Sequence, residues 1–256
     1  MPSVSIVLPT RNRPEALPQA LERVSWQTHP ELQLILVRDG GFPLDAGTEE
    51  WLDRLDFPTT RLEHDDPPAG AARSRNRGVE ASRGEAIAFL DDDDLWERDH
   101  VARLAAALDR DPSLQVAYSD AVILDTATGM TRRLAQDFDL SVFGRDGFIP
   151  PSAMLVRRGA FGRFGGFDGA LAYSEDWDWL LRLARDGGRI ARVPGASVTV
   201  RIHADGMSQP APERASERRR CLDELSRRYG LAPIAPKTFW EVAETLCSGP
   251  PSVSTR

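Results

Sequence analysis

The sequence predicts an α/β fold: a Rossmann-like, doubly wound and mainly parallel sheet with a C-terminal helical extension. Two observations predict this fold: short apolar runs alternate with stretches of helical spacing, and the segments that join them are short. Length is the third, since 256 residues can bury the core of one large domain with an appendage. Such sheets bind ligands at the carboxyl ends of their strands.

Strand and helix signals alternate from the start of the chain. Residues 4–8 form an apolar run that Pro9 ends, and 15–27 carries apolar residues at helical spacing. A second apolar run, 32–37, stops at Asp39 and two glycines. The next expected elements are a helix at 48–55, a weak strand at 61–63, a helix at 70–82 and a fourth strand at 85–90.

The second half of the chain is less regular. Residues 98–108 and 174–185 have helical spacing, whereas 126–148 is poorly patterned and predicts a loop-rich insertion of the kind that often carries binding function. The other expected elements are strands at 116–119, 121–124, 153–156, 190–193 and 197–202, a short helix near Gly159, a linker at 209–212 and a charged helix at 213–229. The predicted division is a domain of residues 1–208 and a helical extension of residues 209–256.

Composition argues against several classes of protein. A net charge of -7 disfavours a nucleic-acid binder, which usually carries a basic surface. Cys221 and Cys247 are far apart and form no CxxC pair, so we expect neither a zinc site nor a disulfide framework, and a reducing cytoplasm fits. We expect no signal peptide and no transmembrane segment, because no apolar stretch approaches the roughly 18 residues of a membrane span.

Four consecutive carboxylates, Asp91 to Asp94, follow the fourth strand. On an extended backbone Asp91 and Asp93 would share one side and Asp92 and Asp94 the other. Like charges at roughly 5 Å repel by about 3 kcal/mol at an effective dielectric of about 20, so this run predicts a bound cation. The alternative is a solvated acidic loop. Residues 9–13 and Asp39 end neighbouring strands and are expected at the same edge of the sheet.

Six segments follow one another along the chain: SIVLPTRNRP, LILVRDGG, PPAGAARSRNRG, AFLDDDDLW, GGFDGALAYSEDWDWLLRL and VRIHADGMS. In this order they resemble the PTxNR turn, VVDDGS segment, GxxxARNxG helix, FLDxDDxW form of the DxD motif, GGFDExLxxxEDxDLxxRL segment and YRxHxxSxS ending of glycosyltransferase family 2, which has the GT-A fold. The matches cover about four fifths of the chain. The resemblance implies inverting transfer of a sugar from a nucleoside diphosphate sugar to an acceptor, usually with Mg²⁺ or Mn²⁺.

The acidic run would hold that metal on the diphosphate. Mg²⁺ and Mn²⁺ prefer hard oxygen ligands, which carboxylates supply. By the resemblance, Asp93 binds the metal, Asp91 binds the ribose or a metal-bound water, and Asp94 supports them. Asp92 stands at the family's variable position; we count it with the nucleotide-binding residues but expect it to face away from the metal. His203 is a candidate third ligand, although a lone histidine near a strand end is usually an ordinary polar residue.

Inverting transfer also needs a base opposite the leaving group. By the family's ED motif this is Asp176, with Glu175 orienting the acceptor or the base and Asp178 structural. The alternative is helix stabilisation, since acids in a first turn favour the helix dipole and Ser174 is a good N-cap. Tryptophans at helical spacing, such as Trp177, more often pack a core than stack on a sugar.

The nucleotide would contact the turn after the first strand, Asp39 and Arg75. The turn residues are Pro9, Thr10, Arg11, Asn12 and Arg13. Asp39 suits the imide N–H of uracil or thymine, so UDP- or dTDP-sugars are the expected donors. Arg38 and Gly41 depart from the family's Asp and Ser, which leaves the nucleobase open.

Alternative functions are a nucleotidyltransferase acting on sugar phosphates, a phosphohydrolase or a non-catalytic nucleotide-sugar-binding module. The acceptor is a glycan, a lipid-linked molecule or a small molecule. We expect a cytoplasmic protein, with peripheral contact to the inner face of the membrane if the acceptor is lipid-linked. The charged helix at 213–229 is more often a solvated helix packed on its own domain than a membrane element.

Overall fold

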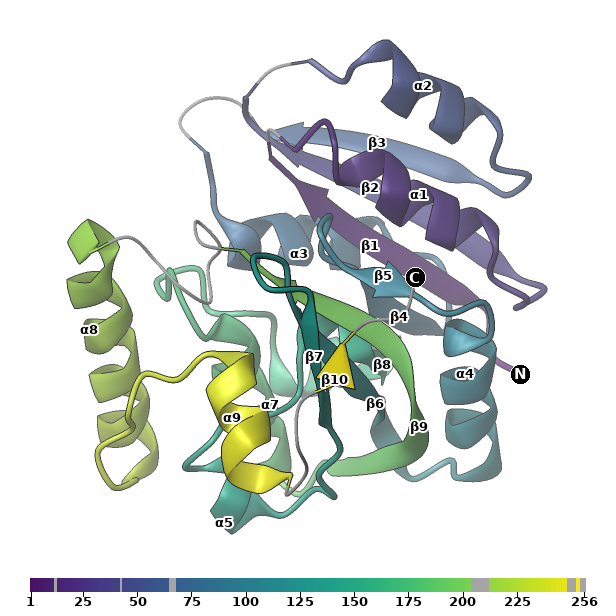
Figure 1. The fold of residues 1–256 in the computed structure, drawn as a ribbon. Helices are drawn as coiled ribbons and strands as arrows, with labels where there is room; N and C mark the ends of the chain where they lie inside the picture. Colours follow the sequence, from purple (N-terminus) through teal and green to yellow (C-terminus); the bar gives the residue numbers. More distant parts are fainter. Residues whose placement is uncertain (12, 42, 65–67, 204–211, 248–251, 254–256) are drawn as a thin grey trace.

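The structure, a computed structural model, describes residues 1–256 apart from 12, 42, 65–67, 204–211, 248–251 and 254–256. Its centre is one curled sheet with the strand order β10-β7-β6-β8-β4-β1-β2-β3, and β9 pairs with both β5 and β6 (Figure 1). The α/β fold class predicted from the sequence is confirmed.

The N-terminal half of the sheet is parallel. Its strands are β1 (Val4–Thr10), β2 (Leu32–Asp39), β3 (Thr59–His64) and β4 (Ala86–Phe89), joined by α1 (Leu17–Ser25), α2 (Ala46–Asp53) and α3 (Ala71–Ala81). β1 pairs in parallel with β2 on one side and with β4 on the other. The chain moves outward from β1 to β3 and returns to β4, so the strand order reverses between β1 and β4. Doubly wound sheets bind ligands at this switch point.

The second half of the sheet is mixed, so the expected parallel arrangement holds only for the first half. Its elements are β5 (Leu95–Trp96), α4 (His100–Arg110), β6 (Leu114–Asp125), β7 (Met130–Leu134), α5 (Leu140–Phe143), a 3-10 turn (Pro151–Ala153), β8 (Met154–Arg157), α6 (Arg158–Phe164), α7 (Glu175–Arg185) and β9 (Arg189–Ile202). β8 runs antiparallel to β4 and β6, and β7 is antiparallel to β6. β9 is parallel to β6, with shifts of register around Asp120.

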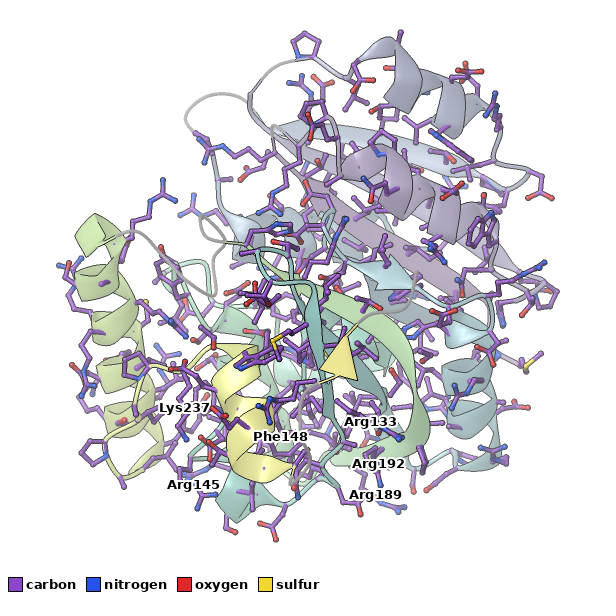
Figure 2. The ribbon with its side chains drawn as sticks, in the orientation of Figure 1. Arg133, Arg145, Phe148, Arg189, Arg192 and Lys237 are labelled. Carbon is purple, nitrogen blue, oxygen red and sulfur yellow. The ribbon has the colours of Figure 1, made fainter. Side chains whose placement is uncertain are left out.

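A buried carboxylate fixes that irregular pairing. Asp120 accepts hydrogen bonds from Arg192 Nη1 at 2.7 Å, Arg133 Nη2 at 2.5 Å and the backbone N–H of Gly195 at 3.0 Å. Figure 2 labels the two arginines, which come from β7 and β9. A buried charge is tolerated where such donors satisfy it. Asp120 therefore ties β6, β7 and the bulged part of β9 together.

The C-terminal segment packs on the same body. It contains α8 (Pro212–Tyr229), α9 (Phe239–Leu246) and β10 (Ser252–Val253), which pairs antiparallel with β7. Leu222 and Leu225 of α8 are buried, as expected for a charged helix packed on its own domain. The division at residues 208 and 209 stays a prediction.

Several boundaries predicted from the sequence were wrong. The strand pairs 116–119 with 121–124 and 190–193 with 197–202 are single strands, β6 and β9, because the bulge accommodates the polar and glycine residues between them. The insertion 126–148 contains β7 and α5 rather than only loops. α9 was missed, although the capping box of Thr238 and Glu241 that begins it is a sequence signal. The expected linker at 209–212 lies almost entirely outside the described residues.

Candidate active site

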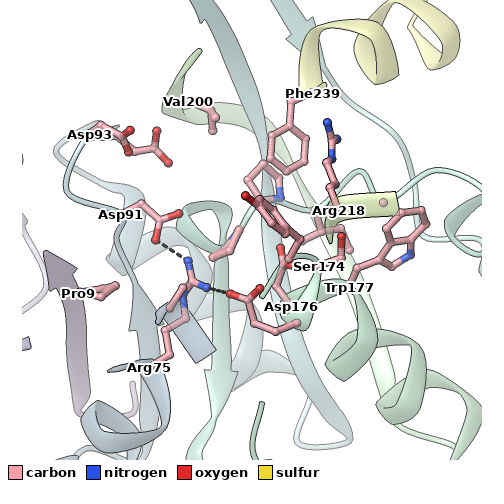
Figure 3. Close-up of a pocket in the computed structure, with 18 of the residues that line it drawn as sticks. Pro9, Arg75, Asp91, Asp93, Ser174, Asp176, Trp177, Val200, Arg218 and Phe239 are labelled. Carbon is pink, nitrogen blue, oxygen red and sulfur yellow. Dashed lines mark hydrogen bonds and ion pairs between the residues drawn. The ribbon is translucent and has the colours of Figure 1, made fainter. Parts of the chain in front are cut away.

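A cavity of about 660 Å³ opens at the carboxyl ends of β1 and β4. The residues after β1, Asp39 and the acidic run line one side. The N-terminus of α7, the 126–148 insertion and the C-terminal helices line the other, as the close-up in Figure 3 shows in part. The sequence predicted the first side from strand order, whereas the second is assembled by tertiary packing.

The four aspartates sit on a tight turn, which corrects the expectation of an extended backbone. The N–H of Asp94 donates to the carbonyl of Asp91 at 3.0 Å. The side chains therefore do not alternate, and the four carboxylates contact different sets of partners, with Arg13 shared by Asp92 and Asp93, instead of converging on one point. Three of the balancing cations are arginines distant in sequence: Arg13, Arg75 and Arg201. The repulsion among the carboxylates, from which we predicted a bound metal, is in large part balanced by these arginines.

Asp92 and Asp94 hold neighbouring segments in place. Asp92 is buried and accepts hydrogen bonds from the Thr10 hydroxyl at 2.7 Å and the N–H of Arg11 at 3.3 Å. Asp94 is also buried and accepts from the N–H of Arg201 on β9 at 3.1 Å. Asp92 thus shapes the turn after β1, and Asp94 shapes the β9 edge of the site.

Asp93 lies beside His203, as the proposed metal pair requires. Its Oδ2 is 3.9 Å from Nε2 of His203 and also pairs with the guanidinium of Arg13. The hydroxyl of Thr126 lies 2.9 Å from the carbonyl of Ile202 and 3.2 Å from Nδ1 of His203. The Thr126 hydroxyl has one hydrogen, which it donates to the carbonyl of Ile202. Its oxygen then accepts a hydrogen bond from Nδ1–H of His203, so Nε2 of this neutral imidazole carries the free lone pair.

This arrangement fits a divalent cation. Nε2 of His203 is buried without a hydrogen-bond partner among the described residues and faces a carboxylate oxygen. Burial, with Arg201 and Arg13 nearby, lowers the pKa of His203, which favours the neutral, metal-binding imidazole. In the described part of the chain no three His, Cys, Asp or Glu side chains form a complete metal site. Water and substrate oxygens would complete the coordination.

Arg75 links the acidic turn to α7. Its guanidinium is buried, donating to Asp91 at 2.6 Å and to Glu175 (Figure 3). Asp91 therefore points to Arg75 rather than sharing one side with Asp93. The N–H of Asp91 is itself fixed by the Ser152 hydroxyl at 3.0 Å. This bridge joins two motifs 100 positions apart, and the sequence indicated neither the bridge nor its burial.

Asp176 lines the cavity from the first turn of α7. Burial raises its pKa, while Arg75 opposes that rise. Ser174 begins the helix but makes no capping hydrogen bond with its side chain, so the capping alternative was wrong for this residue. Ser174 has φ 62° and is the only described non-glycine residue with positive φ; such strain is concentrated at functional sites. Asp178 is buried against Arg228 and Tyr229, in agreement with its structural assignment.

The expected nucleobase contact, Asp39, is buried and engaged with the backbone. Its two oxygens accept from the N–H groups of Ala69 and Gly70 at 2.7 and 2.9 Å. It therefore positions the start of α3 at the cavity edge. Arg38 pairs with Glu63 at 2.6 Å. Among the turn residues, Pro9, Thr10, Arg11 and Arg13 line the cavity, and Asn12 lies outside the described residues.

Sequence reasoning missed much of the opposite wall. Trp177, expected in the core, lines the cavity and donates to the carbonyl of Phe143 at 2.8 Å. A Cβ at Gly147 would lie 2.6 Å from the Trp177 ring, so only glycine fits there. Trp96 and Trp179 are fully buried, as expected. Phe239 and Lys237 of the C-terminal segment also line the cavity, and no motif indicated this.

Glu175 gives the site a pH-dependent contribution to stability. Burial raises its pKa to about 7, against the lowering effect of Arg75. Because the folded state then binds this proton more tightly than the unfolded state, the contribution of Glu175 to the free energy of unfolding falls as pH rises from about 4.5 to about 7. We expect Glu175→Gln to reduce this fall, by up to about 3 kcal/mol. Urea unfolding at several pH values measures this change of the free energy of unfolding with pH, and Glu80→Gln, at an exposed residue, is the control. The same pH dependence in both variants would contradict the prediction.

A family model described as "Glycosyl transferase family 2" matches residues 5–165, more than half of the chain. The chain belongs to glycosyl transferase family 2. The matched span runs from β1 through the acidic turn to α6 and stops before α7. Within this glycosyltransferase, the second wall of the cavity is therefore built mainly by segments after the family model ends.

Curated relatives support the same assignment. An uncharacterised glycosyltransferase, YwdF of Bacillus subtilis, is 32% identical over 249 residues, covering 92% of this chain and 87% of its own length. A PGL/p-HBAD biosynthesis glycosyltransferase of Mycobacterium tuberculosis is 32% identical over 197 residues, covering 75% of this chain and 73% of its own.

Solved structures share the GT-A fold. TarS 1-349 of S. aureus in complex with UDP-GlcNAc has a TM-score of 0.69 at 16% identity, covering 95% of this chain and 71% of that one. The mannosyltransferase PcManGT of Pyrobaculum calidifontis, in complex with GDP-Man and Mn²⁺, has a TM-score of 0.66 at 19% identity, covering 95% and 68%. The chain spans 43% of a longer crystallised TarS. Among the described helices of this protein, none has the length and apolarity to span a bilayer.

Proposed function

We propose that this glycosyltransferase transfers a sugar, with inversion and with a divalent metal, from a nucleoside diphosphate sugar to an acceptor hydroxyl. The observation that carries the proposal is the position of Asp176. It lines the cavity on the side opposite the acidic turn and is connected to that turn through Glu175, Arg75 and Asp91. A base there can face the acceptor while the donor diphosphate lies at the turn.

Asp176 would take the proton from the acceptor hydroxyl as that oxygen attacks the anomeric carbon. Burial raises the pKa of Asp176, which makes its carboxylate a better proton acceptor than a solvated one. Glu175 stays bound to Arg75 and orients the first turn of α7. Ser174, strained and lining the cavity, is suited to contact a substrate hydroxyl.

Asp93 and His203 would hold Mg²⁺ or Mn²⁺. The ion would supply Lewis acidity for the charge that grows on the departing diphosphate. Asp91, paired with Arg75, is suited to the ribose or a metal-bound water. Arg13 would lie near the phosphates, since it already ion-pairs with both Asp92 and Asp93.

The nucleoside would occupy the space between the turn after β1 and the start of α3. Thr10, Asp39 and Arg75 line the cavity there, together with Ser74, whose buried hydroxyl has no partner among the described residues. Each carboxylate oxygen of Asp39 accepts one backbone N–H and keeps a second lone pair, which would accept the imide N–H of uracil or thymine. Since TarS was solved with UDP and PcManGT with GDP-Man, both bases belong in the test.

Metal binding is tested directly by titration. We expect Asp93→Ala and His203→Ala each to weaken Mn²⁺ binding by about tenfold or more, because each removes one of two facing donors. The electron paramagnetic resonance signal of free Mn²⁺ measures the affinity without any turnover. Asp53→Ala, an exposed aspartate of α2, is the control. Unchanged affinity in both cavity variants would remove these residues from the metal site.

A panel assay tests the function as a whole. The protein is incubated with UDP-, dTDP- and GDP-sugars and Mn²⁺, and released nucleoside diphosphate and the anomeric configuration of the product are measured. Release with an inverted product supports the proposal. Release of pyrophosphate from a sugar phosphate and a nucleoside triphosphate indicates a nucleotidyltransferase, and binding without release indicates a binding module.

We further propose that residues 1–208 form the catalytic domain and 209–256 a helical extension that completes the cavity. A cytoplasmic location, with contact to the inner membrane face for a lipid-linked acceptor, is part of the same hypothesis. Fractionation of cells that express the tagged protein tests it.

A further inference from the structure

The side of the cavity beyond Asp176 is basic. Four cationic side chains line it: Arg145, Arg214, Arg218 and Lys237. They come from three separate segments, the insertion before β8, α8 and the loop before α9. In Figure 3, Asp176 and Ser174 lie between the acidic turn on one side and Arg218 and Trp177 on the other. The cavity therefore changes sign from the proposed donor end to this basic end.

Beyond Asp176, the described residues that line the cavity include these four cations and one acid, Asp146. Asp146 is buried and shared by Arg145 at 2.8 Å and Lys237 at 2.7 Å. Arg218 donates to a neutral acceptor, the carbonyl of Lys237, at 2.5 Å. Arg214 forms no ion pair within the described part of the chain. Arg214 and Arg218 are four residues apart on α8 and so share one face of the helix.

Aromatic side chains border Arg218. Tyr173, Trp177 and Phe239 line the same part of the cavity, and Figure 3 labels the last two beside Arg218. Apolar walls lower the local dielectric, so a cation among them attracts an anion more strongly than one in open solvent. A purely solvated charged helix face would lack such walls.

We propose that the acceptor carries an anionic group, a phosphate or a carboxylate, which Arg214, Arg218, Lys237 and Arg145 bind while the acceptor hydroxyl faces Asp176. This inference rests on the proposed function, because it assigns the basic end to the acceptor and the acidic turn to the donor. Fork-shaped guanidinium groups match the oxygen geometry of both anions. The basic end thus sets acceptor specificity rather than chemistry.

Binding is the first test. Glycerol 3-phosphate and glycerol are titrated calorimetrically into the protein, and phosphatidylglycerol vesicles are tested by sedimentation as a lipid-borne phosphate. We expect glycerol 3-phosphate or the vesicles to bind and glycerol not to. Arg214→Gln/Arg218→Gln should weaken that binding at least tenfold. Arg220→Gln/Arg227→Gln, which removes two exposed arginines of the same helix, should leave it unchanged.

The competing location for an anion is the donor end. Arg13→Gln should leave glycerol 3-phosphate binding unchanged. The proposal is overturned if Arg13→Gln loses this binding while Arg214→Gln/Arg218→Gln retains it. Absence of binding to both probes, or equal loss in the two α8 double variants, also overturns it. Donor binding, measured as the thermal shift with each nucleotide and Mn²⁺, should be unaffected by Arg214→Gln/Arg218→Gln. A missing donor shift in wild-type protein would instead count against the proposed function.

Discussion

Replacing Asp176 by asparagine is expected to reduce sugar transfer by about 10²- to 10⁴-fold while donor affinity stays near that of the wild type. Asparagine keeps the shape of the side chain but cannot accept the proton of the acceptor hydroxyl at neutral pH. The donor contacts proposed at the turn after β1, Asp39 and the acidic turn do not involve this carboxylate. The loss should therefore fall on kcat rather than on donor binding.

The measurement is nucleoside diphosphate release under saturating donor and metal, with donor affinity taken from a thermal-shift titration. Asp186→Asn, at the exposed C-terminal end of the same helix, removes the same charge outside the cavity and should leave turnover within about twofold, since surface substitutions are usually nearly neutral. Wild-type kcat should rise with pH as Asp176 loses its proton, because burial raises its pKa. Near-normal turnover in Asp176→Asn would show that another group is the base.

The parallel half of the fold was predictable because local patterns decide it. Buried strands read as short apolar runs, and α1 repeats its buried residues Leu17, Leu21 and Val24 at helical spacing. Because ligand-binding residues gather at the carboxyl ends of the strands, the sequence also predicts that Thr10, Asp39 and Asp91 lie at one edge of the sheet. All three line the cavity.

The detail of the acidic turn was not predictable from the sequence. The expectation of a shared side for Asp91 and Asp93 assumed an extended backbone, and a single turn hydrogen bond removes that assumption. The arginines that balance these charges lie far away in sequence. No spacing rule connects Arg75 to Glu175 or Arg201 to Asp94, because those contacts depend on how the strands are ordered.

The basic wall was hidden for a related reason. Arg214 and Arg218 looked like members of a solvated helix, and that helix does pack through Leu222 and Leu225. The same packing places both arginines on the lining of the cavity, with Arg214 exposed to solvent. Charge composition alone does not indicate which face of a helix closes a site.

At pH 8, Arg75→Met is expected to lower the free energy of unfolding by about 3–5 kcal/mol, the range typical of breaking a buried ion pair. The guanidinium is only 6% exposed and its partner Glu175 only 5%, so removing the cation leaves a carboxylate with neither water nor a counter-charge. Arg75 also lowers the pKa of Glu175, so in the variant that pKa rises further and the residue takes up a proton. The loss should consequently shrink as pH falls, because a protonated Glu175 no longer needs the arginine.

Urea unfolding at pH 5 and pH 8 measures both effects, and Arg73→Met, an exposed arginine of the same helix, is the matched control. The double variant Arg75→Met/Glu175→Gln should regain at least half of the lost stability, since the buried charge is gone, yet it should not regain transfer. In the wild type one guanidinium contacts both Glu175 of α7 and Asp91 of the acidic turn. Methionine and glutamine cannot form this bridge between the two segments. Equal unfolding midpoints for wild type and Arg75→Met would mean that packing alone sets the spacing between the acidic turn and Asp176. Recovery of stability without recovery of transfer would assign the Arg75–Glu175 ion pair the role of positioning the base relative to the donor.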